Sequence, residues 1–346
     1  TSLQRNLISS SNPRAMYFND ETHLAWMPGG KVEIISFDSE SGGRFFIEDP
    51  PENPGEKIAF TSPNRCFGCH GGAATNFLPG PVARSHFTGE DGRRYGQVKG
   101  HDRVSHDVPF KDRWGGYFVT GAPATLEHLG NAFAKRTGSQ VFVDRLNHRA
   151  KDSLVDHFDP DLLPRPDSSI VPLLIFDHQI EAHNLIMEAR YRHRQIGFET
   201  EKFGKPTSKT YKDTEKFFDR VARYFLFADE APLTGHAIMR NPEYEAEFRK
   251  NRKQDSKGRS LRDFDLEDRI FRYRLSYMLQ TPTFLDSPEG MKNRVYDRLW
   301  PILSSDVAPE GFKHFSKAER TAILEILLET QEDLPPSWKS TEFANR

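Results

Sequence analysis

Cysteine is almost absent from this chain, with 2 among 346 residues. Long hydrophobic runs are absent too: the best apolar window, Ile170 to Phe176, is far shorter than the roughly 18 residues that a membrane-spanning helix requires. Charge of one sign is not in excess, because 48 Lys and Arg stand against 50 Asp and Glu, for a net charge of −2. These absences exclude a membrane-spanning helix and make a globally basic nucleic-acid-binding protein unexpected.

Glycine is scarce in the second part of the chain, where 6 of the 24 occur after residue 150. Before that point, residues 31–48 have the pattern of a β-hairpin, with apolar runs on both sides of Ser41-Gly42-Gly43. Beyond it, apolar stripes and capping residues predict helices at 170–194, 212–227, 243–251, 265–280, 288–303 and 316–331. We therefore expect a mainly α fold with a small N-terminal β-hairpin region, divided into a β- and loop-rich region at 1–165 and a helical domain at 166–346 that packs on it.

One stretch of the helical part is unusually basic. Residues 249–259 carry Arg249, Lys250, Arg252, Lys253, Lys257 and Arg259. Such a loop is either a solvated linker or a docking patch for an acidic partner.

Both cysteines stand in one motif, Cys66-Phe67-Gly68-Cys69-His70. A thioredoxin-type pair needs a buried strand before it and a helix after it, but Thr61-Ser62-Pro63-Asn64 and Gly71-Gly72 fit neither requirement. A zinc site needs two further ligands, for which His101 and His106 have the right mutual spacing but lie far along the chain.

Covalent haem is the third chemistry that this spacing serves. Cys66 and Cys69 would form thioethers with the two vinyl groups, and His70 would lie under the iron as proximal ligand. The motif uses every cysteine in the chain, so we expect one haem c, bound within the loop-rich region. Attachment of this kind is made outside the cytoplasm, and the sequence starts at Thr1, so we expect an exported protein with its signal peptide removed, located in the periplasm or at the cell surface.

Several short sequence strings, with this motif among them, resemble those of a known protein family. They are Asn12 to Asp20, Cys66 to His70, Ser105-His106-Asp107-Val108-Pro109, Arg113 to Gly121, His128 to Asn131, Asp177-His178-Gln179 with His183-Asn184, Arg294 to Trp300, and Ala322 to Leu327. Together they resemble a family of secreted monohaem cytochrome-c-like proteins, largely uncharacterised, from planctomycetes and other Gram-negative bacteria. The resemblance implies haem binding and no particular reaction. The chain departs from it at Ala122-Pro123-Ala124, where family members often carry Thr-His-Gly.

The group on the other side of the iron decides between electron transfer and small-molecule chemistry. His106, near the motif, and His183, on the predicted helix, are the candidate distal ligands, followed by His178, His128, His101 or no ligand. Arg113 and Trp114 are candidate donors to the haem propionates, because guanidinium and indole N–H groups suit carboxylates.

The function that we expect is that of a periplasmic monohaem c-type cytochrome, with electrons passing to or from a redox partner protein. A haem oxidoreductase of peroxidase or oxygenase type, with a distal histidine, is the alternative, and a haem-containing structural or assembly subunit is a further one. The sequence indicates no nucleic-acid partner and leaves the oligomeric state open.

Overall fold

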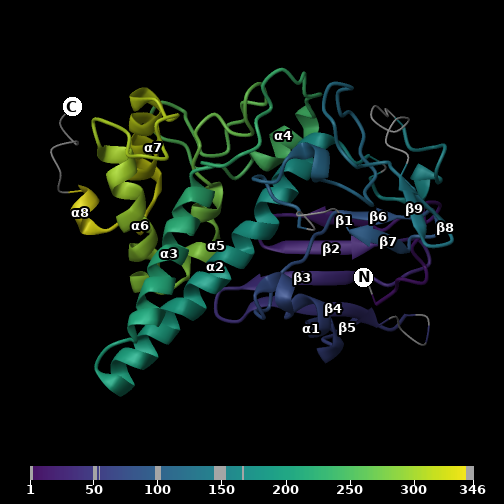
Figure 1. The fold of residues 1–346 in the computed structure, drawn as a ribbon, viewed down its shortest axis with the longest axis horizontal. Coiled ribbons are helices and arrows are strands. Elements are labelled where there is room, and N and C mark those ends of the chain that lie inside the picture. The colour runs from purple at the N-terminus through teal and green to yellow at the C-terminus, as the bar shows by residue number, and fades with distance from the viewer. Residues whose placement is uncertain are drawn as a thin grey trace. The chain divides into compact units, whose positions relative to one another are not determined.

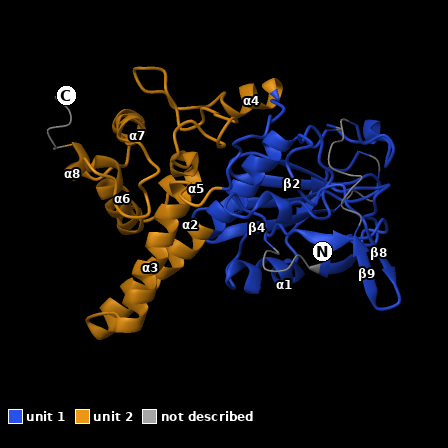
Figure 2. Cartoon of the chain, turned by 45° about the horizontal axis from the view of Figure 1, so that its top comes forward, with its two compact units in different colours: residues 1–184, 231–241 blue, residues 185–230, 242–346 orange. Residues whose placement is uncertain are grey.

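The structure is a computed structural model that describes residues 3–49, 53, 55–97, 103–143, 153–165 and 167–339. It contains two compact units, shown in different colours in Figure 2: residues 1–184 with 231–241, and residues 185–230 with 242–346. The chain passes from one unit to the other within helix α2 (Ile170–Phe203), whereas the sequence placed the boundary between residues 165 and 166.

The expectation of a mainly α fold with only a small hairpin is wrong. The first unit has a five-stranded antiparallel sheet in which the strands follow one another in chain order: β1 (Ala15–Phe18), β2 (Thr22–Trp26), β3 (Glu33–Asp38), β4 (Gly42–Asp49) and β5 (Ala59–Thr61). Helices make up 37% of the structure and strands 15%. The hairpin expected at 31–48 is present as β3 and β4, and it forms the middle of a larger sheet (Figure 1).

One face of this sheet is apolar, and helix α2 covers part of it. Phe18 pairs with His23, His23 with Ile35, and Ile35 with Phe45, so these four side chains share a face. Phe176 of α2 lies 5.3 Å from both Phe18 and His23 between ring centroids. The N-terminal half of α2 therefore packs on the sheet within the first unit, and its residues carry the polar groups discussed below.

The rest of the first unit is rich in loops, as expected. It has two small hairpins, β6 (His86–Thr88) with β7 (Arg94–Gln97) and β8 (Ala134–Thr137) with β9 (Gln140–Val143). Short helical turns occur at η1 (Asn64–Cys66), α1 (Phe67–His70), η2 (Ala73–Thr75), η3 (Phe110–Asp112) and η4 (Pro160–Leu162). Residues 103–132 form no helix or strand longer than η3, yet many of their side chains are buried, among them Val104, Trp114 and Leu129. This loop segment is therefore part of the core.

The second unit is helical, and most of its predicted helices are confirmed. It contains α3 (Ser208–Phe225), α4 (Pro242–Phe248), η5 (Tyr277–Gln280), α5 (Pro282–Leu285), α6 (Glu289–Ser304), α7 (Lys317–Thr330) and α8 (Pro336–Lys339). The stripe expected in α3, with Phe217, Val221 and Phe225, is buried. The helix expected at 265–280 is wrong, because this segment is built of turns before η5. Among the described residues no helix is both long and apolar enough to cross a membrane.

The basic segment 249–259 is tied by ion pairs to helix α7 and to the residues that follow it. Lys257 and Arg259 both contact Glu325, at 2.8 and 2.5 Å, and Lys253 lies 3.2 Å from Glu332. Much of the positive charge is thus matched within the chain, which favours a structural linker over a docking patch.

Candidate haem attachment site

The residues of the Cys-x-x-Cys-His motif occupy one helical turn. η1 ends at Cys66, whose backbone is itself helical (φ −59°, ψ −36°), and α1 continues from Phe67 to His70. At about 100° per residue, Cys66, Cys69 and His70 fall within an arc of about 100°. The local backbone therefore presents two sulfur atoms and one imidazole on one side of a single turn, which is the arrangement that thioether attachment with proximal ligation requires.

The imidazole of His70 is oriented by a backbone carbonyl. Its Nδ1 lies 3.0 Å from the carbonyl oxygen of Gly80. A carbonyl can only accept, so Nδ1 carries the proton and Nε2 keeps its lone pair. Burial, together with the positive charge of Arg14, lowers the pKa of His70, so the ring is neutral near pH 7. The ring stands against Phe45 of strand β4, at 4.7 Å between centroids. This is the state of a histidine that is ready to bind a metal.

The two cysteines do not have the properties of a redox pair. They form no disulfide in this structure. Burial and the negative charge of Glu33 raise the pKa of the Cys66 thiol, whereas a thioredoxin-type site lowers the pKa of its nucleophilic thiol. Within the described residues no group of three or more His, Cys, Asp and Glu side chains is arranged to hold a metal ion. His101, the other zinc candidate, lies outside the described residues, so the zinc alternative gains no support.

Apolar side chains are exposed in and near the motif. Phe67 is 43% exposed and Phe77 is 73% exposed. Both Asn76 and Phe77 have positive φ, 51° and 61°, a backbone conformation that asparagine adopts readily but that is uncommon for a bulky residue such as phenylalanine. A porphyrin is a flat apolar group that would cover such surface. The donor set and its surroundings therefore fit a covalent haem.

The candidate distal histidines lie in two separate buried groups. His183 stacks on Phe37 at 3.5 Å between centroids, and its Nε2 lies 3.0 Å from the carbonyl oxygen of Asp20. Phe37 and Phe45 share the apolar face of the sheet, so His183 and His70 lie over the same face. His106 instead pairs with His178, with 2.8 Å between their Nδ1 atoms. The distal assignment remains a prediction for both residues, and the structure places His183 on the face that also carries the motif.

The four distal candidates within the described residues, His106, His128, His178 and His183, are all buried. Burial lowers the pKa of His106, His178 and His183. His128 accepts a hydrogen bond from the backbone N–H of Gly130 at its Nδ1.

Arg113 and Trp114, the predicted propionate donors, are bound to protein acceptors. Neither side chain is exposed, and both contact the same carboxylate oxygen of Asp177, Trp114 Nε1 at 3.0 Å and Arg113 at 3.4 Å. Arg113 also donates to the carbonyls of Val108 and His106, each at 2.6 Å. These contacts stabilise the loop against helix α2, and they do not support a role in binding propionates.

Several residues of the site carried no role in the sequence analysis. Arg14 and Glu33, which lie 3.4 Å apart, act electrostatically on His70, whose ring is held by the Gly80 carbonyl. Asn184 donates to the neighbouring carbonyl of Pro81, and Asp177 accepts from Arg113 and Trp114. Arg14, Asp177 and Asn184 do belong to strings that carry the family resemblance. Their place in these strings was the only sign in the sequence that they have a role, because the residues that they contact are distant in sequence.

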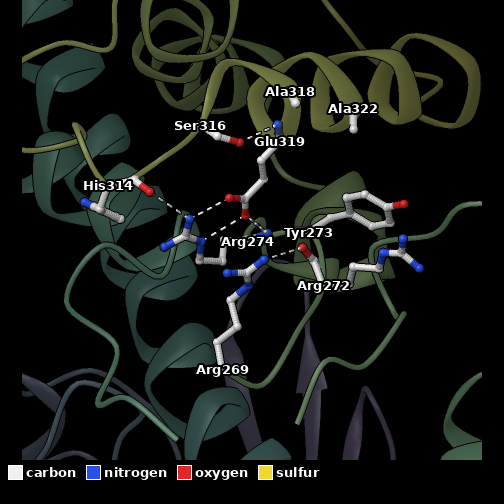
Figure 3. Close-up of a pocket in the computed structure, with 9 residues that line it drawn as sticks. All are labelled: Arg269, Arg272, Tyr273, Arg274, His314, Ser316, Ala318, Glu319 and Ala322. Atoms are coloured by element: carbon white, nitrogen blue, oxygen red, sulfur yellow. Dashed lines mark hydrogen bonds and ion pairs between the residues drawn. The ribbon is translucent and has the colours of Figure 1, made fainter. Parts of the chain in front are cut away.

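A pocket of about 380 Å³ lies in the second unit (Figure 3). Its lining includes Arg269, Arg272, Arg274, His314 and Glu319. Arg274 holds both carboxylate oxygens of Glu319, at 2.9 and 2.5 Å, and Arg269 donates to the carbonyls of residues 271 and 272. Most of its polar groups are therefore satisfied inside the chain, and no ligand is indicated.

Comparison of the chain with protein-family models, with curated proteins and with solved structures finds no match. The likeness to monohaem cytochrome-c-like proteins therefore rests on the motifs alone.

Proposed function

We propose that this protein is a periplasmic monohaem c-type cytochrome that exchanges electrons with a redox partner protein. The observation that carries the proposal is the state of His70: its Nδ1 is held by Gly80, its Nε2 is available, and it shares one side of a turn with Cys66 and Cys69. The haem, bound through the two sulfurs, would supply a one-electron ferric–ferrous couple. The partner would be the donor or the acceptor of that electron.

The residues of the chain have defined tasks in this proposal. Cys66 and Cys69 anchor the group covalently, and His70 supplies the proximal nitrogen in a fixed tautomer. Phe45 packs against the His70 ring and limits its rotation. Haem attachment outside the cytoplasm supports the periplasmic or cell-surface location.

The first experiment is production of the exported chain in a host with cytochrome c maturation enzymes. We expect the intact mass to exceed that of the polypeptide by one haem, and a pyridine haemochrome spectrum of haem c. The Cys66→Ser, Cys69→Ser chain should lose both signals while it keeps the circular dichroism of the parent. A parent chain without haem, or with stoichiometric zinc, would refute the proposal.

A second experiment separates the possible functions of the haem protein. A low-spin absorption spectrum that carbon monoxide and cyanide leave unchanged supports electron transfer. A high-spin haem that binds both ligands favours the oxidoreductase alternative with a distal histidine. A haem that neither binds ligands nor exchanges electrons with small redox mediators favours the structural or assembly role.

A further inference from the structure

The segment Pro79–Pro81 is held from three sides by three parts of the first unit. The backbone N–H of Gly43, on strand β4, donates to the carbonyl of Pro79 at 3.0 Å. The backbone N–H of Gly80 donates to the carbonyl of His70 at 2.9 Å. The side-chain amide of Asn184, on helix α2, donates to the carbonyl of Pro81 at 3.1 Å. The sheet, the motif and the helix thus meet at three consecutive residues.

Gly80 and His70 are joined by two hydrogen bonds. Besides the backbone bond, the Gly80 carbonyl accepts from Nδ1 of the His70 ring at 3.0 Å. The position of this single carbonyl therefore sets both the tautomer and the direction of the imidazole. Partners of this kind around a metal ligand determine how basic the ligand is.

Asn184 packs directly against Gly80. A Cβ atom at residue 80 would lie 2.0 Å from Oδ1 of Asn184 and 3.4 Å from Cγ2 of Thr75, and Gly80 and Pro81 are both buried. Only glycine fits beside the Asn184 amide, which touches residue 80 with one end and binds residue 81 with the other. Movement of the Asn184 side chain would therefore move the carbonyl that holds His70.

We infer that Asn184 is a positioning residue for the iron ligand His70, acting through the Gly80–Pro81 backbone. The inference rests on the proposed function for its redox consequence. A firm Nδ1–H···O=C bond makes the imidazole a stronger donor, which favours ferric iron and lowers the midpoint potential. When Asn184 no longer fixes the carbonyl, this bond loosens and the midpoint potential rises.

The test uses the haem-loaded full chain with Asn184→Ala, Asn184→Leu and the milder Asn184→Ser. Asn131→Ala is the matched control, because Asn131 also binds backbone groups, the N–H and carbonyl of Val119, both at 2.8 Å. We expect each Asn184 variant to keep one haem per chain and to have a higher midpoint potential than the parent. Asn131→Ala should lower the melting temperature and leave the potential unchanged. Asn184 variants that lose stability but keep the parental potential would show a merely structural role and overturn the inference.

Two further measurements test the inference in other ways, and the second of them needs no bound haem. As a single change, Gly80→Ala should shift the midpoint potential. In the Asn184→Ala background the same change should shift the potential less, because the shortened side chain no longer clashes with the new Cβ atom. Strictly additive shifts would contradict a direct contact between the two residues. In chain produced without haem, nitrogen NMR of the His70 ring should show the Nδ1–H tautomer in the parent and a mixture in Asn184→Ala. An unchanged tautomer there refutes the positioning role, whereas a parent chain that never binds haem refutes the proposed function alone.

Discussion

The buried ion pair between Arg113 and Asp177 offers a quantitative test of the first unit. Neither side chain is exposed, and the Asp177 carboxylate also accepts from Trp114 Nε1. Asp177→Ala leaves the Arg113 guanidinium buried without its counter-charge and Trp114 without its acceptor. Removal of one partner from a buried pair costs about 3–5 kcal/mol. Because two donors of Arg113 still bind backbone carbonyls, we expect a loss of about 3 kcal/mol, the lower end of that range.

This loss is large on the scale of protein stability. For a unit of this size, each kcal/mol shifts the melting temperature by about 2–4 °C, so the transition of the first unit should fall by about 6–12 °C. The measurement is differential scanning calorimetry at pH 8, where Asp177 is mostly ionised. The pH matters because burial, despite Arg113 and Trp114, raises the pKa of Asp177 to about 7.

The matched control is Asp229→Ala, which breaks the pair of Arg223 and Asp229 on the surface. That pair is close, at 2.5 Å, but its side chains are 38% and 57% exposed, so its loss should cost less than about 1 kcal/mol. If Asp177→Ala destabilises the chain no more than Asp229→Ala, the buried network is not formed as described, and Arg113 again becomes available to haem propionates.

Three other predictions concern separate parts of the chain. His23 lies among three phenylalanine rings, and burial lowers its pKa to about 4, so the wild type loses stability as the pH falls from 6.5 through 4. His23→Phe should lose less stability over this range, measured as the urea midpoint at each pH. Parallel curves for the two proteins would contradict a buried neutral His23. Ser316→Ala removes the cap on the backbone N–H of Glu319 and should cost about 1 kcal/mol, while Ser316→Asn should keep most of it; equal losses would exclude capping. Glu325→Ala should speed tryptic cleavage within residues 249–259, because Lys257 loses its partner and Arg259 keeps only Asp255, whereas Glu332→Ala, which breaks the single, more exposed pair with Lys253, should speed it less; equal rates would show that the Glu325 pairs do not hold the loop.

Local sequence patterns predicted the elements that depend on local interactions. The spacing of Cys66, Cys69 and His70 implied that a short segment brings the three side chains together, and the structure does so with a helical turn that was not predicted. The cap at Ser316 and the apolar stripe of α3 are likewise properties of neighbouring residues. The helix expected at 265–280 failed for a local reason as well: the Asp265 side chain accepts from the backbone N–H of residues 267 and 268, which stabilises a turn in place of a helix.

The five-stranded sheet was missed because its outer strands carry no clear alternation. In β1 all four residues, Ala15 to Phe18, are apolar and partly buried, so the two faces cannot be told apart from the sequence. β5 has three exposed residues and depends on its pairing with β4. Strands as short as these form because they pair with neighbouring strands in the sheet. The sequence pattern of one strand does not show which other strand it pairs with.

Dependence on distant partners also explains why the sequence could not decide the role of Arg113, which was predicted to bind a haem propionate. An arginine next to a tryptophan in a glycine-rich loop has the chemistry to bind a propionate or a carboxylate of the protein, and the sequence offers no means to choose. The choice depends on Asp177, which lies 64 positions away and meets Arg113 only because helix α2 packs on the sheet and the loop. The motif histidine shows the opposite case. His70 is oriented by Gly80, ten positions away, and the chain between them is short enough to form a compact loop. Yet Asn184, again on α2, packs against Gly80 and donates to the carbonyl of Pro81. The spacing of the motif is thus local and readable from the sequence, whereas the residues of helix α2 that contact Gly80, Pro81 and Arg113 are distant from them in sequence.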